Sequence, residues 1–161
     1  QTGRVRAYIY DFVPKEITIE EFLKTGRAIF FPHLGASTYE AETKAMQIVG
    51  ERVNNFFYNG ICQGSVNFPD VPGIVKKDCV YFLVAGFYKP ELVKTIHALM
   101  RATGLNIDSM VSHGREGTGL FLTRVAIKGK SSGERLVKAC REIGEIEGVT
   151  RVRICDPESR Y

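Results

Sequence analysis

His33 is the side chain whose type and position best suit acid–base chemistry. It follows a predicted strand and precedes Gly35 and a predicted helix start, and open α/β sheets bind ligands at such strand ends. A neighbouring carboxylate would raise its pKa and fix the orientation of its ring. The candidate carboxylates lie on the preceding loop and helix: Glu16, Glu20 and Glu21. A single histidine is more often a structural or surface group, so both interpretations stay open.

Other chemistry-bearing residues give weaker signals. The four cysteines stand far apart, with no Cys-x-x-Cys pair and no histidine at ligand spacing, so they predict no metal site. Residues 114–119 reverse the spacing of a dinucleotide-binding glycine motif and are expected to form a hairpin turn. Arg124, Arg151 and Arg153 are predicted to share one sheet face, where they would bind an anion or RNA, meet a second copy, or remain solvated.

The elements that would position His33 lie in the first 60 residues. Strands are expected at 5–11 and 28–31, with a short helix between them. A capping box at Ser37–Glu40 begins a long helix that ends near Gly60. At about 1.5 Å per residue this helix would reach about 30 Å, enough to cross between domains.

The later part of the chain predicts a second architecture. Residues 65–77 hold prolines, a glycine and lysines, a composition typical of a linker. Beyond them, apolar strands alternate with two amphipathic helices in the order βαββαβ. This order predicts an α+β, ferredoxin-like fold, in which two helices cover one face of a four-stranded antiparallel sheet.

Composition restricts the class of protein. With 161 residues, 44% of them hydrophobic and 25% charged, the chain fits one globular domain of ordinary size, or one small domain with an attached piece of another. The excess of 22 Lys and Arg over 18 Asp and Glu arises after Val71 and is typical of a solvated surface. No segment reaches the roughly 18 apolar residues of a membrane span. Together with cysteines expected to be reduced, this predicts a cytoplasmic protein.

The segment Phe-Pro-His-Leu-Gly-Ala-Ser-Thr at residues 31–38, with the helix after it, resembles the end of the nucleotide-binding domain in the D-2-hydroxyacid dehydrogenase family. Residues 76–156 resemble the ACT regulatory domain that follows in such enzymes. The resemblance implies that residues 1–64 are a remnant of a Rossmann-type NAD-binding domain. It implies that residues 65–77 are a linker and residues 78–157 an ACT-type domain.

The same resemblance implies roles for single residues. His33 matches the general acid/base that exchanges a proton with the 2-hydroxyl of the substrate, and Glu16 matches the carboxylate that supports it. The nicotinamide side of the NAD site would be lined by Asp11, His33, Leu34, Gly35 and Ala36. The family's substrate-binding arginine and glycine-rich motif are expected upstream of Gln1, so the chain alone is expected to be inactive.

In the ACT resemblance, Gly86, Tyr88 and Asn106 occupy effector positions. In family members that serine inhibits, the positions of Gly86 and Tyr88 hold a His and an Asn. Each hydrogen bond to serine that is missing here would cost about 1 to 3 kcal/mol of binding free energy. Serine is therefore disfavoured, while another amino-acid effector stays open. ACT units commonly pair side by side, which implies a homo-oligomer. A stand-alone amino-acid sensor is an alternative function.

An RNA-recognition motif has the same βαββαβ order and is a third alternative. It needs two stacking aromatic side chains on the third strand of the sheet. Residues 119–124 offer only Phe121. Nucleic-acid binding is therefore not expected.

Overall fold

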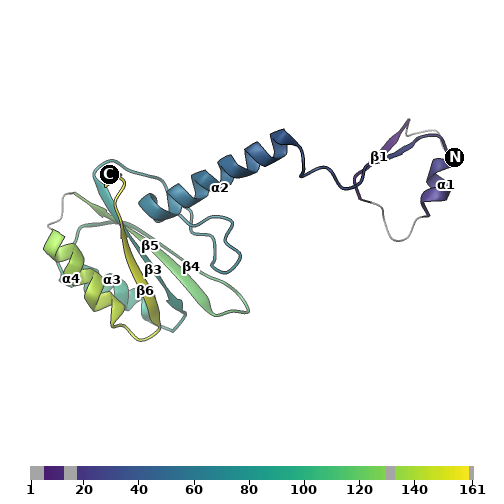
Figure 1. Cartoon of the computed structure of the whole chain (residues 1–161). Coiled ribbons are helices and arrows are strands. Elements are labelled where there is room, and N and C mark those ends of the chain that lie inside the picture. Colours follow the sequence, from purple (N-terminus) through teal and green to yellow (C-terminus); the bar gives the residue numbers. More distant parts are fainter. Residues whose placement is uncertain (1–5, 13–17, 130–132, 160–161) are drawn as a thin grey trace. The chain divides into compact units, whose positions relative to one another are not determined.

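The computed structural model describes residues 6–12, 18–129 and 133–159. It divides the chain into two compact units, residues 1–49 and residues 50–161. The division differs from the predicted linker at 65–77 and falls within a continuous helix. Figure 1 shows both units and labels every helix and every strand except β2.

In the first unit, two short strands pair in parallel. They are β1 (Tyr8–Tyr10) and β2 (Ala28–Phe30), and α1 (Ile19–Leu23) lies between them in sequence. The turn after α1 contains Gly26 at φ 62°, a left-handed conformation that glycine adopts at low cost. β1 is shorter than the strand predicted over 5–11, of which residue 5 lies outside the described part.

The long helix α2 (Tyr39–Asn59) follows the turn that carries His33. Its first turn is capped by Thr38, whose Oγ1 accepts a hydrogen bond of 3.1 Å from the backbone N of Ala41. The capping residue is therefore one position later than the predicted Ser37. Residues up to Val49 belong to the first unit, and the rest of the helix belongs to the second.

The second unit is a four-stranded antiparallel sheet in the order β4-β5-β3-β6, with α3 and α4 on one face (Figure 1). The order of strands and helices along the chain confirms the predicted ferredoxin-like α+β fold. The elements are β3 (Cys79–Phe87), α3 (Leu92–Ala102), β4 (Ile107–Gly114), β5 (Leu120–Lys128), α4 (Gly133–Gly144) and β6 (Val149–Cys155).

The two faces of this sheet bury two separate apolar clusters. Alternate residues of β3 and β5, such as Phe82 and Val125, pack against α3 and α4. The intervening residues, such as Tyr81 and Leu122, form a second cluster on the other face. The sheet is thus buried on both sides, although an antiparallel sheet often leaves one face to water.

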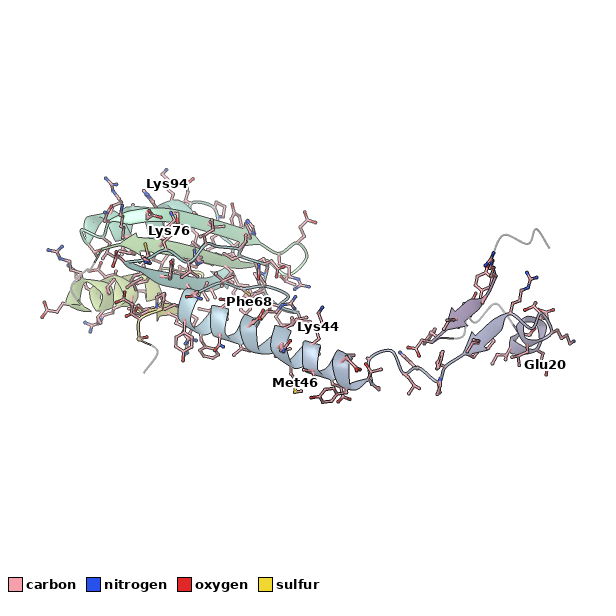
Figure 2. The ribbon with its side chains drawn as sticks, turned by 90° about the horizontal axis from the view of Figure 1, so that it is seen from above. Glu20, Lys44, Met46, Phe68, Lys76 and Lys94 are labelled. Atoms are coloured by element: carbon pink, nitrogen blue, oxygen red, sulfur yellow. The ribbon has the colours of Figure 1, made fainter. Side chains whose placement is uncertain are left out.

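The second cluster is covered by the carboxyl end of α2 and by the segment that follows it. Phe56 and Phe68 pack against the cluster, and Val71 is fully buried within it. Figure 2 labels Phe68 close to the sheet. Val71 also exchanges two backbone hydrogen bonds with Cys62. The segment predicted as a linker is therefore packed onto the sheet around Phe68 and Val71, while residues 72–77 are exposed.

Candidate functional site

The His33–Ala36 turn is held by the carboxylate of Asp11. Its Oδ1 accepts a hydrogen bond of 2.5 Å from the backbone N of Leu34, and its Oδ2 accepts one of 2.7 Å from the backbone N of Gly35. A Cβ at Gly35 would lie 2.6 Å from that Oδ2, so only glycine permits this approach. Asp11 follows β1 and the turn follows β2, so both lie where parallel strands end.

His33 is exposed and has φ 59°, a left-handed conformation that costs a non-glycine residue free energy. Its ring meets the ring of Phe12 edge-on, with 5.5 Å between the centroids. Glu16, the expected supporting carboxylate, lies outside the described residues. Glu20, labelled in Figure 2, and Glu21 are exposed on α1. The pairing of His33 with a carboxylate therefore stays a prediction.

The first unit does not by itself enclose a dinucleotide. None of its described residues is buried, and both carboxylate oxygens of Asp11 already accept backbone hydrogen bonds. The sequence also holds no G-x-G-x-x-G motif to receive a pyrophosphate. Among the described residues of this unit, no buried group is therefore available to surround the phosphates of a dinucleotide.

Gly86, the first predicted effector position, is needed for packing between β3 and β6. A Cβ there would lie 2.0 Å from the carbonyl oxygen of Gly148 and 2.8 Å from a ring carbon of Phe121. The register of the β3–β6 pair also shifts next to it, between Ala85 and Gly86. The absence of a side chain at Gly86 thus has a structural reason that is independent of any ligand.

Tyr88 and Asn106, the other two effector positions, lie at opposite ends of the sheet. The backbone N of Tyr88 donates to the carbonyl oxygen of Gly119, just before β5. The carbonyl oxygen of Asn106 accepts a hydrogen bond from the backbone N of Lys128, the last residue of β5. A strand of nine residues spans about 30 Å at about 3.4 Å per residue. Within one chain, these positions do not form one site.

Two open clefts meet at Tyr88, which is 61% exposed. Their volumes are about 630 Å³ and about 500 Å³, and both are lined by Tyr88 and Val93. The first extends along the β4–β5 hairpin to Arg115 and Glu116, and the second extends along α3 to His97. Each cleft combines an apolar wall with charged or titratable groups, as a small polar ligand requires.

Arg124 is only 3% exposed, on the sheet face opposite α3 and α4. Its Nε donates to the carbonyl oxygen of Asn59 at 2.8 Å, and its guanidinium carbon lies 3.9 Å from the ring centroid of Tyr81. Burial lowers the pKa of the guanidinium below its usual value. This burial was not predicted, although all residues of 120–127 other than Thr123 and Arg124 are apolar.

The other two arginines of the predicted patch, and Phe121, bear on the anion and RNA alternatives. Arg153 lies over the ring of Phe57, 4.1 Å from its centroid, while Arg151 is exposed. An open patch of three arginines is therefore absent from this face. Phe121 is fully buried on the helix side of the sheet, where it cannot stack on a base.

The thiols show no sign of activation. Cys62, Cys79 and Cys155 are buried, and burial raises the pKa of Cys62, Cys140 and Cys155 above the usual thiol value. Over the residues that the structure describes, no three His, Cys, Asp or Glu side chains gather as metal ligands would. In the same part of the chain, no helix has the length and hydropathy needed to span a membrane.

A search of curated proteins finds D-3-phosphoglycerate dehydrogenase of Dictyostelium discoideum. It is 25% identical over 131 residues, which are 78% of this chain and 32% of the relative. The chain therefore spans about a third of the length of the curated relative that it matches. No family model matches the chain.

Solved structures with a similar fold include the ACT domain of GTP pyrophosphokinase from Chlorobium tepidum. It has a TM-score of 0.41 and 18% identity, covering 47% of this chain and 95% of that domain. A formyltetrahydrofolate deformylase from Pseudomonas putida KT2440 has a TM-score of 0.44 and 14% identity, covering 52% of this chain and 30% of that protein. The ferredoxin-like assignment itself rests on the strand order and register of the sheet.

Proposed function

We propose that this chain is part of a D-3-phosphoglycerate dehydrogenase. That enzyme would oxidise 3-phosphoglycerate to 3-phosphohydroxypyruvate with NAD, in the first step of L-serine biosynthesis. The observation that carries the proposal is the turn at residues 33–36, which Asp11 holds through two backbone amides at the ends of paired parallel strands. The similarity to the Dictyostelium discoideum enzyme supports it.

In this proposal, His33 exchanges a proton with the 2-hydroxyl of the substrate, and Glu16 supports it. Residues 34–36 and Asp11 line the nicotinamide side of the NAD site, and NAD supplies the hydride acceptor when bound. The exposure of His33 leaves its ring accessible to a substrate. The described residues do not form the remaining parts of a dinucleotide site, and the sequence holds no G-x-G-x-x-G motif, so the 161-residue chain alone would be inactive.

The test compares two histidine variants in the full-length protein that contains this chain. His33→Asn should reduce kcat for NAD-dependent 3-phosphoglycerate oxidation by about 10²-fold or more, because it removes the general acid/base. His113→Asn, a matched change at an exposed position of β4, should leave kcat unchanged. Equal activity of the two variants, or oxidation of 3-phosphoglycerate by the isolated 161-residue chain, would contradict the proposal.

The second unit would be the regulatory and dimerising domain of that enzyme, or of a stand-alone amino-acid sensor. β4 and β6 are the outer strands of its sheet, so each has one edge free to pair with another copy. The expected result of analytical ultracentrifugation is a dimer.

Calorimetric titration with L-serine should show no heat of binding, whereas another amino acid would bind at the clefts beside Tyr88.

A further inference from the structure

Phe12 lies beside the turn that carries His33, next in sequence to the aspartate that holds this turn. The carboxylate of Asp11 accepts hydrogen bonds from the backbone amides of Leu34 and Gly35. Phe12 contacts the side chain of the turn instead, because its ring meets the imidazole of His33 edge-on. The ring centroids are 5.5 Å apart and the ring planes are 84° apart. Two consecutive residues after β1 therefore contact both the backbone of the turn and its histidine ring.

The backbone of the turn does not by itself fix the orientation of the imidazole. The φ of 59° at His33 and the hydrogen bonds at the next two residues fix where its side chain leaves the backbone. The torsion about the Cβ–Cγ bond of a histidine has a broad energy profile, so the ring turns unless a neighbour holds it. Among the described residues, neither ring nitrogen of His33 has a hydrogen-bond partner, and Phe12 supplies its one aromatic contact.

The edge-on arrangement of the two rings is one that aromatic pairs favour. The positive edge of one ring meets the negative face of the other, and rotation of either ring out of this arrangement loses the attraction. His33 is nevertheless exposed, so the contact leaves part of the imidazole open to a substrate. The contact with Phe12 thus restricts the rotation of the imidazole without enclosing it.

The ring of Phe12 does not fill a core. It is 67% exposed and belongs to neither apolar cluster of the second unit. No described residue of the first unit is buried, so the ring packs into no interior there either. Replacement of such an exposed side chain changes the stability of a protein little. An effect of a Phe12 variant on activity can therefore be separated from an effect on folding.

We propose that Phe12 is a positioning residue for His33. Its ring holds the imidazole in the orientation in which that group exchanges a proton with the 2-hydroxyl of the substrate. The inference rests on the proposed dehydrogenase function and adds to it, since Glu16 is proposed to support His33 separately. A general acid/base acts only within hydrogen-bond reach of the proton that it transfers. Loss of the ring contact should therefore lower turnover rather than substrate binding.

The kinetic test uses the full-length protein that contains this chain. Phe12→Leu keeps an apolar side chain but removes the ring. It should lower kcat for 3-phosphoglycerate oxidation by about two- to tenfold, the factor by which an edge-on ring pair favours one orientation. KM for NAD and for 3-phosphoglycerate should not change. Phe12→Tyr keeps the ring and should keep kcat.

Phe31→Leu is the matched control for the loss of a ring. Phe31 is also exposed and lies two residues before His33, but among the described residues its ring does not contact the imidazole. This variant should leave kcat unchanged. A fall in kcat as large as that of Phe12→Leu would overturn the proposal, because it would show that any exposed phenylalanine near the turn has the same effect.

Nuclear magnetic resonance tests the geometry without a need for activity. In the 161-residue chain, the ring current of Phe12 should shift the imidazole proton resonances of His33, which His33→Asn identifies by their absence. Phe12→Leu should move these resonances towards those of a histidine without an aromatic neighbour, and Phe31→Leu should not. The resonances of His97 and His113 should stay in place. Resonances of His33 that do not respond to Phe12→Leu would overturn the contact.

The kinetic outcomes separate this inference from the proposed function. A loss of kcat in His33→Asn together with full kcat in Phe12→Leu would overturn the role of Phe12 and leave the proposed function intact. A raised KM for NAD with unchanged kcat in Phe12→Leu would overturn it too, because Phe12 would then line the cofactor site. Full activity of His33→Asn would contradict both proposals.

Discussion

The two units of the chain both contain strands rich in branched and aromatic residues, but only the second unit buries them. Ile9 in β1 is 69% exposed and Ile29 in β2 is 51% exposed, whereas Phe82 and Val84 in β3 are fully buried. Among the described residues, no layer buries the faces of the three-residue strands β1 and β2, whereas parallel strands are normally covered on both faces. Strand-forming sequence therefore does not make a core unless other elements cover the sheet.

The largest expected effect comes from a matched pair of phenylalanine truncations. Phe82→Ala removes a fully buried ring from the second unit and should lower the free energy of unfolding by about 3 to 5 kcal/mol. Phe31→Ala removes a ring that is 45% exposed and should change the free energy of unfolding by no more than about 0.5 kcal/mol. Urea denaturation of the full chain measures both. Similar losses would mean that the first unit has a core of its own.

A smaller loss of unfolding free energy is expected where β3 and β6 approach closely at Gly86. Gly86→Ala introduces a Cβ against the carbonyl oxygen of Gly148 and should cost about 1 to 3 kcal/mol, because the strands must separate. Gly114→Ala at the end of β4 meets its nearest neighbouring atom at 3.9 Å and serves as the control. The urea midpoint should fall in the first variant alone. An unchanged midpoint for Gly86→Ala would show that the strand spacing is not tight.

A local effect is expected in the first unit from Asp11→Ala. The variant removes the acceptor for the backbone amides of Leu34 and Gly35, so their hydrogen exchange should accelerate by about tenfold. The urea midpoint of the second unit should not move, since Asp11 contributes nothing to its clusters. Unchanged exchange at Leu34 and Gly35 would show that the carboxylate does not hold the turn in solution.

The smallest effect concerns the exposed ion pair between Lys76 and Asp108. The hydrogen bond from Lys76 lowers the pKa of Asp108, and the same bond raises the pKa of Lys76. The stabilisation by Asp108 is therefore present above its unfolded-state pKa and is lost as the pH falls through the lowered value. Asp108→Asn should lower the urea midpoint slightly at pH 7 and not in strong acid. A difference that persists in acid would exclude the ion pair as its cause.

The types and order of the elements could be predicted because they depend on local periodicity. Alternating apolar residues specify strands such as β5, and the ends of helices are marked by short-range signals such as the polar residues near Thr38. The position of His33 after a strand and before a helix follows from the same signals. These features need only contacts between residues that are close in sequence.

The tertiary structure decided the features that depend on contacts distant in sequence. It packs part of the segment at residues 60–76 over the sheet, so Arg124 is buried rather than part of an open patch. It places Tyr88 and Asn106 at opposite ends of the sheet. It also brings Asp11 to the turn at residues 34–35. Neither composition nor periodicity encodes which face a loop covers, because that choice depends on the apolar area that remains exposed after the sheet has formed.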